Sequence, residues 1–244
     1  AHYEGGIRVP TIVRWPGRSF ITTAGIGMSV AVLVTAMQWL DAIDHMVDVY
    51  FLDAQAQHVS VGFAEPRSSE VVRGLARLPG VQTTEPMRAV AAKIRRGWRE
   101  EREALQGLPA HQELYRVFDA DGRVVDLPAE GVVISTMLAQ MLDVRVGEDI
   151  TVEVLEGRRP VFDVPVAATF ETYIGSPAYI EIGALARLMR ERPSVTAVHL
   201  RVDTNQSPEL FRELKALPRI SSVTVKEAAV QTFHETMAQT ITIF

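Results

Sequence analysis

The feature that most constrains this chain is a run of residues without a charge, from Phe20 to Leu40. As an α-helix rising about 1.5 Å per residue, this run would extend roughly 30 Å, which is the thickness of the hydrocarbon core of a bilayer. Its hydroxyl side chains can hydrogen-bond carbonyl oxygens of their own helix, so that only Gln38 is costly in lipid. The run therefore predicts a transmembrane helix, with a buried helix of a soluble protein as the alternative.

The charges that flank this run predict its orientation. Arg14 and Arg18 precede the run, while Asp41 and Asp44 follow it. Positive residues are enriched on the cytoplasmic side of membrane helices. We therefore expect the N-terminus in the cytoplasm, and residues of about 41–235 outside the cell (inner) membrane.

Apolar residues also recur three and four positions apart beyond the run and at the C-terminus, which is the spacing of an amphipathic helix. The first series extends the membrane helix into a stalk over residues 18–52, through Trp39, Ile43, Met46 and Tyr50. The second series indicates a stalk and the start of a second membrane helix over residues 227–244, through Val230, Phe233, Met237, Ile241 and Phe244.

Two similar strand–helix–strand patterns open and close the region between the stalks, residues 53–226. The first begins with the alternating HVSVGF, which Pro66 is expected to end, and continues with a helix capped by Ser68 or Ser69. The second has a helix that starts at Ser207-Pro208 and buries a face reaching Leu217. The two helices end on similar sequences, LARLPGV and LKALPRI. This order predicts an extracytoplasmic split βαβ (ferredoxin-like) domain.

A β-rich insertion is expected between these units, at about residues 125–190, so the predicted fold class is α+β. Gly131 to Ile134 has the pattern of a strand, and Ser135 is placed to cap a short helix bearing Leu138, Met141 and Leu142. Two alternating segments then follow, around Val152 and from Val161 to Ala168, and these predict a β-hairpin.

Composition excludes several classes of function. The net charge of −5 argues against a nucleic-acid partner, because binding phosphates requires a basic surface. The chain has no cysteine, which excludes disulfides, Cys-ligated metals and thiol nucleophiles. It also contains no Gly-x-x-x-x-Gly-Lys-Ser/Thr string, so that it does not bind ATP through a P-loop.

Two short motifs resemble metal sites but are incomplete. His234-Glu235 begins like a zinc-protease helix, yet Ala238 stands where the second histidine would be needed. Residues 119–122, DADG, begin like a calcium loop but lack its later glycine and glutamate, so we interpret them as a turn. The sequence therefore assigns no catalytic, cofactor-binding or metal-binding residue, and no cofactor.

Two further segments have surface character. Lys93 to Arg102, KIRRGWREER, mixes basic residues with Trp98, but the glutamates at 100, 101 and 103 offset part of the charge, which favours a solvated strand–turn–strand over an anion-binding patch. Glu171, Tyr173 and Tyr179 surround Gly175-Ser176-Pro177 and are expected in an exposed loop. Such a loop either contacts a partner or merely connects two elements.

Several strings together resemble ABC transporter permeases of the FtsX/MacB type. They are RSFITTAGIGMSVAVLV, the Leu-x-x-Leu-Pro helix ends, GVVISTMLAQMLDVRVGEDITVEVLEG and FHETMAQTITIF. The resemblance implies a permease subunit with four membrane helices, a periplasmic core domain and no enzyme activity of its own. It also implies a cytoplasmic ABC ATPase subunit as partner, besides the lipid bilayer and other permease helices or a second permease copy.

Only part of such a permease is present in the sequence, so two other functions stay open. One is a single-anchored extracytoplasmic binding or interaction module. The other is a sulfatase fragment, because residues 1–17, containing HYEGGIRVPTIVRWPG, resemble a segment of the arylsulfatase family. The nucleophile motif of that family is absent, and we therefore expect residues 1–17 to be a sulfatase-like remnant joined near Gly17.

Overall fold

The computed structural model describes residues 16–47, 55–118, 123–172, 175–217 and 219–228. The chain divides into two compact units, Ala1–Val47 and Asp48–Phe244. Among the described residues the first unit is a single helix, and the second is a β-rich domain with short helices. The chain is therefore of mixed α+β type, as the sequence predicts.

Helix α2 spans Pro16–Val47 (32 residues) and so extends beyond the apolar run. This confirms the predicted stalk up to Val47, where the described part of the helix ends. Proline suits the start of a helix because the N–H that it lacks would have no partner there. The hydroxyls of Thr22, Ser29 and Thr35 donate to the carbonyl four residues earlier over 2.8–3.0 Å. The window Phe20–Gln38 is long and apolar enough to cross a membrane, and none of it is buried in the protein, unlike the core helix of a soluble protein.

Four strands of the second unit form an antiparallel sheet in the order β9-β1-β8-β2. Each strand–helix–strand unit contributes two of these strands and one helix. The side chains of Leu75, Leu210 and Leu214 join both helices to the sheet in one buried cluster. The elements are β1 (Val59–Ser68), α3 (Glu70–Leu75), β2 (Val81–Arg96), β8 (Ser194–Val202), α6 (Ser207–Ala216) and β9 (Ile220–Val225).

Two local expectations for these units are wrong. Strand β1 continues past Pro66 to Ser68, because its register with β8 shifts between Gly62 and Arg67. A bulge of this kind leaves proline outside the hydrogen-bonding ladder, which is one of the few places in a sheet where it is tolerated. Leu217 lies beyond the end of α6, and 43% of its surface is exposed, so it does not belong to the buried face.

The remaining strands form a closed ring with the second half of β2. Among the described strands the pairs run β2-β3-β7-β4-β6-β5 and back to β2, and only β3–β7 and β4–β6 are parallel. One buried cluster includes Ile94, Leu105 and Ile134 from this barrel, Leu138 from α4 and Leu185 from α5. The elements are β3 (Arg99–Leu108), β4 (Val132–Ser135), α4 (Thr136–Leu142), β5 (Asp149–Val154), β6 (Val161–Phe170), β7 (Ala178–Glu181) and α5 (Ile182–Met189).

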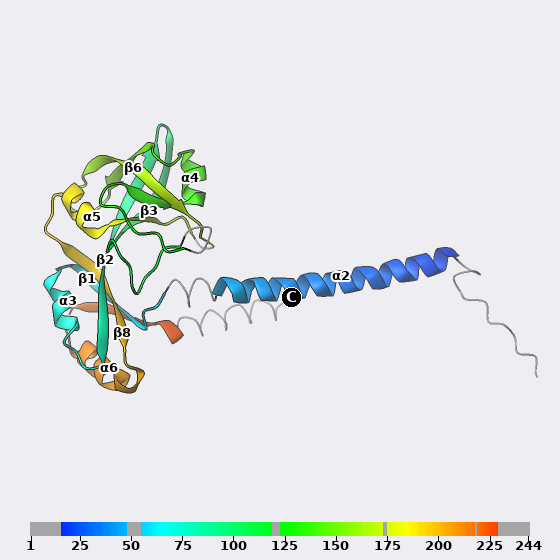
Figure 1. Ribbon diagram of the computed structural model, residues 1–244, viewed down its shortest axis with the longest axis horizontal. Helices are drawn as coiled ribbons and strands as arrows, with labels where there is room; N and C mark the ends of the chain where they lie inside the picture. Colours follow the sequence, from blue (N-terminus) through cyan, green and yellow to red (C-terminus); the bar gives the residue numbers. More distant parts are fainter. Residues whose placement is uncertain (1–15, 48–54, 119–122, 173–174, 218, 229–244) are drawn as a thin grey trace, which may run out of the picture. The chain divides into compact units, whose positions relative to one another are not determined.

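The local predictions for the barrel are largely confirmed. Ser135 caps α4, since its Oγ accepts the N–H of Leu138 over 3.1 Å, and β5 and β6 form the expected antiparallel hairpin. Met141 differs from the expectation, because it faces outward and is exposed. The β-rich part is also larger than residues 125–190, since Arg88 to Gly107 contribute a long hairpin to the same barrel. Strand β2 runs through both sheets and makes them continuous (Figure 1).

Candidate functional site

The segment Lys93 to Arg102 forms the end of the β2–β3 hairpin, as its pattern predicts. Gly97 has φ +60, a left-handed conformation that glycine adopts without steric cost in such a turn. Lys93 pairs with Glu100 over 3.5 Å, and Arg96 pairs with Glu148 over 2.7 Å. Glu100 and Glu148 therefore offset part of the positive charge of this segment, which fits a solvated face.

The structure tests only some of the other predictions, which concern the incomplete metal motifs and the expected exposed loop. Residues 119–122, Tyr173 and His234-Glu235 lie outside the described residues. Within the described ranges, no group of three or more His, Asp or Glu side chains could hold a metal ion. The expectation that Tyr179 lies in an exposed loop is wrong, because Tyr179 belongs to β7 and only 5% of its surface is exposed.

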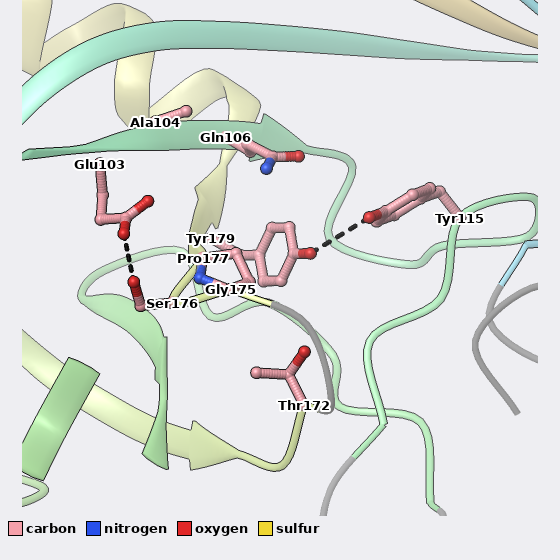
Figure 2. Close-up of a pocket in the computed structure, with 9 residues that line it drawn as sticks. All are labelled: Glu103, Ala104, Gln106, Tyr115, Thr172, Gly175, Ser176, Pro177 and Tyr179. Atoms are coloured by element: carbon pink, nitrogen blue, oxygen red, sulfur yellow. Dashed lines mark hydrogen bonds between the residues drawn. The ribbon is translucent and has the colours of Figure 1, made fainter. Parts of the chain in front are cut away.

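A pocket of about 190 Å³ lies where β7 begins to pair with β3 (Figure 2). Three stretches of chain line it: β3, the segment after β3, and the residues that lead into β7. Its lining residues are Glu103, Ala104, Gln106, Tyr115, Thr172, Gly175, Ser176, Pro177 and Tyr179. The carboxylate of Glu103 accepts a short hydrogen bond from the hydroxyl of Ser176, which is itself buried.

Aromatic rings form the back of this pocket and are held by further rings. The hydroxyls of Tyr115 and Tyr179 are 3.3 Å apart, as Figure 2 shows. Tyr179 packs against Phe170 with 5.1 Å between ring centroids, and Tyr115 stacks on His199 with 5.4 Å between centroids and 13° between planes. Because each phenol is supported from another side, the wall of the pocket is preorganised.

A buried carboxylate fixes the segment that carries Tyr115. Glu85 lies on β2 and is 4% exposed, and its carboxylate accepts the backbone N–H groups of Glu113, Leu114 and Tyr115 over 2.7–3.1 Å. Hydrogen bonds to a charged acceptor are roughly twice as strong as those between neutral groups. Glu85 therefore positions one wall of the pocket. No local motif marks it in the sequence, apart from its being a charged residue within an otherwise strand-like run.

His199 supports the same wall from the sheet. It lies opposite Glu85 across the β2–β8 ladder, and its Nδ1 is 2.8 Å from the hydroxyl of Ser60. Its Nε2 is buried without a hydrogen-bond partner in the described part of the chain. Burial removes water from the charged imidazolium and lowers the pKa of His199 from 6.5 to about 4.

This pKa shift predicts that the domain loses stability on mild acidification. The folded state holds His199 neutral, whereas the unfolded chain takes up the proton below pH 6.5, so stability falls as the pH drops from 6.5 toward 4. We expect a loss of about 2 kcal/mol in unfolding free energy between pH 7.5 and pH 5 from this group. Urea unfolding of the full chain in detergent, followed by circular dichroism at several pH values, measures this loss.

The matched variants for this prediction are His199→Gln and His111→Gln. The first should flatten the pH dependence between pH 5 and 7, even if it lowers stability at every pH. His111 has an exposed side chain paired with Asp126, so its replacement should leave most of the pH dependence unchanged. The assigned role of His199 is wrong if both variants retain the slope of the original chain.

Comparison with protein families shows to which family this chain belongs. A family described as "MacB-like periplasmic core domain" matches residues 19–217, which is most of the chain. This chain is a member of that family. A MacB-like periplasmic core domain is part of an ABC transporter permease and is not an enzyme, which confirms the expectation that the chain has no enzyme activity of its own.

Solved structures include distant likenesses of this MacB-like domain. One is the extracellular domain of the noncanonic ABC-type transporter YknZ from Gram-positive bacteria, with 16% identity and a TM-score of 0.49, over 68% of this chain and 98% of that one. Another is the periplasmic region of MacB from Actinobacillus actinomycetemcomitans, with 10% identity and a TM-score of 0.47, over 75% of this chain and 95% of that one. No curated protein matches the chain in sequence.

Proposed function

We propose that this chain supplies the first membrane helix and the extracytoplasmic domain of an ABC transporter permease subunit driven by a separate cytoplasmic ATPase. The observation that carries this proposal is the span of the family match, residues 19–217, which takes in most of α2 together with the domain. The given sequence contains no P-loop string, which is consistent with a motor on a separate polypeptide. The task would be to couple ATP-driven motion to the outer domain, in export, lipoprotein handling or mechanotransmission.

The absence of cysteine allows a direct test of this coupling. A single cysteine at exposed Glu65 carries a spin label in the complete permease, reconstituted with its ATPase in nanodiscs. We expect the distance between labels on two permease copies to change between the nucleotide-free and vanadate-trapped states. An ATPase variant that binds but does not hydrolyse ATP is the control. A distance that stays constant during active hydrolysis would contradict the proposal.

The proposed orientation places the N-terminus in the cytoplasm and residues of about 41–235 outside. It is supported by the positive charges before the apolar window and the negative charges after it. The test uses single-cysteine variants of the protein in intact spheroplasts, which are treated with a maleimide that does not cross membranes. We expect labelling of Glu65→Cys and Val161→Cys, and none of Gly5→Cys until the membrane is permeabilised. The reverse pattern would overturn the orientation.

The four-stranded sheet supports the ferredoxin-like arrangement that we propose for the first and last strand–helix–strand units of residues 53–226. In that arrangement two βαβ units interleave, so that each unit contributes one central and one outer strand. The order β9-β1-β8-β2, with every neighbouring pair antiparallel, agrees with it. The barrel is then an insertion between β2 and β8.

Residues 227–244 would continue into a second membrane helix, whose neighbours are other permease helices or a second permease copy. Their apolar spacing supports this proposal, but all except 227 and 228 lie outside the described residues. The alternative of a single-anchored interaction module predicts that the gene encodes no further apolar spans. Sequencing the complete gene distinguishes the two, since the permease requires three spans after Phe244.

The sulfatase-like remnant concerns residues 1–17 alone. Residues 19–217 belong to the MacB-like family, which removes a sulfatase as the function of the described domain. The proposed junction near Gly17 lies before residue 19, where that match begins, and residues 1–15 lie outside the described part of the chain.

A further inference from the structure

We propose that the pocket between β3 and β7 binds an alkylammonium group, with Glu103 as its counter-ion. This inference does not depend on the coupling to an ATPase proposed above. It assigns a ligand chemistry to a pocket on the barrel, where the sequence had marked only a possible contact loop.

The first argument is charge. Among the described residues that line the pocket, Glu103 is the single Asp, Glu, Lys, Arg or His. Ser176 occupies its Oε1, and the described residues provide no hydrogen bond to Oε2. The pocket therefore presents a negative charge with an open acceptor, and its described lining contains no Lys, Arg or His that competes for it. A ligand that carries a positive charge and N–H donors complements both features.

The second argument is the aromatic wall. An ammonium ion close to the face of a phenol ring is attracted by the negative face of the ring's quadrupole. Tyr115 and Tyr179 both line the pocket with their ring planes at 59° to each other and their centroids 6.2 Å apart. Figure 2 shows the two tyrosines joined at their hydroxyls, while Glu103 and Ser176 form a second pair on the other side of Tyr179. The site thus combines a carboxylate with two rings that Phe170 and His199 hold in place.

The third argument is size. Small-molecule and cofactor sites usually enclose roughly 300–1,000 Å³. At about 190 Å³ this pocket is smaller, so it fits an extended alkyl amine or the end of one side chain. Gln106 adds a side-chain carbonyl to the lining, which can accept a further N–H. The same chemistry can come from a free amine or from a lysine of a partner protein, and the experiment below distinguishes these sources.

The test uses the full chain in detergent with its tyrosines replaced by 3-fluorotyrosine, and Tyr115→Phe and Tyr179→Phe assign the two ¹⁹F resonances. Titration with n-butylamine at pH 7.5 should shift both resonances saturably. n-Butanol and pentanoate, which have the same n-butyl chain but no positive charge, should leave them unchanged. Because the three compounds are compared on the same fluorotyrosine-labelled protein, this comparison does not rely on a Glu103 variant that folds.

Variants then locate the counter-ion. Hydrogen bonds to charged groups contribute about 1.5–3 kcal/mol, so Glu103→Gln should weaken n-butylamine binding by at least 10-fold. Glu100→Gln on the same strand is the matched control, because Glu100 is exposed, pairs with Lys93 and does not line the pocket. The ¹⁹F spectrum without ligand shows whether each variant keeps the fold.

N-acetyl-lysine methylamide identifies the source of the amine. Binding at least as tight as that of n-butylamine supports a lysine side chain, because the added backbone is then tolerated at the mouth of the pocket. Binding of n-butylamine alone supports a small free amine. Equal shifts with n-butanol, no saturable shift with either amine, or an unchanged affinity in a folded Glu103→Gln variant would each overturn the proposal.

Discussion

Replacing Glu85 with alanine is expected to lower the free energy of unfolding by about 3 kcal/mol or more. The substitution removes the acceptor of three backbone N–H groups, at Glu113, Leu114 and Tyr115, and the N–H of Leu114 is buried. A buried donor left without a partner costs about 1–3 kcal/mol. Because these donors are consecutive, the segment they belong to, whose Val117 packs in one buried cluster with Val133 and Tyr179, should detach locally before the domain unfolds.

Urea unfolding measures the stability, and hydrogen exchange of the full chain reports on the segment itself. We expect faster exchange at residues 113–117 in Glu85→Ala, with Glu85→Gln intermediate because its amide still offers one carbonyl oxygen. Glu65→Ala is the matched control, since Glu65 is an exposed glutamate of β1 in the same sheet. Equal exchange in the Glu85→Ala and Glu65→Ala variants would show that the carboxylate does not hold the segment.

The second large effect is expected from Ile134→Ala inside the barrel. Ile134 lies on β4 and is fully buried among side chains of the barrel and of helices α4 and α5. Truncating a buried isoleucine removes apolar contacts and leaves a cavity, which typically costs 2–5 kcal/mol. We expect about 3 kcal/mol, measured as a shift in the urea midpoint at constant slope.

Val161→Ala on β6 provides the comparison for this variant, because Val161 is 55% exposed. It should change stability by less than about 0.5 kcal/mol, as surface substitutions usually do. If Ile134→Ala is no more destabilising than Val161→Ala, the cluster inside the barrel is not the core on which the domain depends.

The features that could be predicted are those with a short-range cause. The uncharged run of α2, the cap of Ser135 and the hairpin of β5 and β6 each depend on residues within a few positions of one another. The two strand–helix–strand units were also recognisable, because their helices end on similar sequences. In each case the periodicity, cap or turn residue determines the element with little help from distant packing.

The features that sequence reasoning missed depend on distant partners. The closure of the barrel requires parallel pairing of β3 with β7, across more than sixty residues of chain, and no local pattern specifies such a pair. Tyr179 appeared to belong to an exposed loop because glycine, serine and proline precede it, yet Phe170 and Tyr115 bury it. Glu85 looked like an ordinary surface charge, since its partners are backbone groups about thirty residues away.

Strands β1 and β9, which carry the chain into and out of the second unit, are direct neighbours in its sheet. Val59 lies opposite Val225, and the N–H of Lys226 donates to the carbonyl of His58 over 2.9 Å. Neighbouring strands are about 4.8 Å apart, so both ends of the domain share one point of attachment. If both ends are displaced together, the domain moves as a rigid body. A displacement that separates them puts tension on the outermost hydrogen bond first and peels β9 from β1, so the sheet withstands a pull on both ends together better than a pull that separates them.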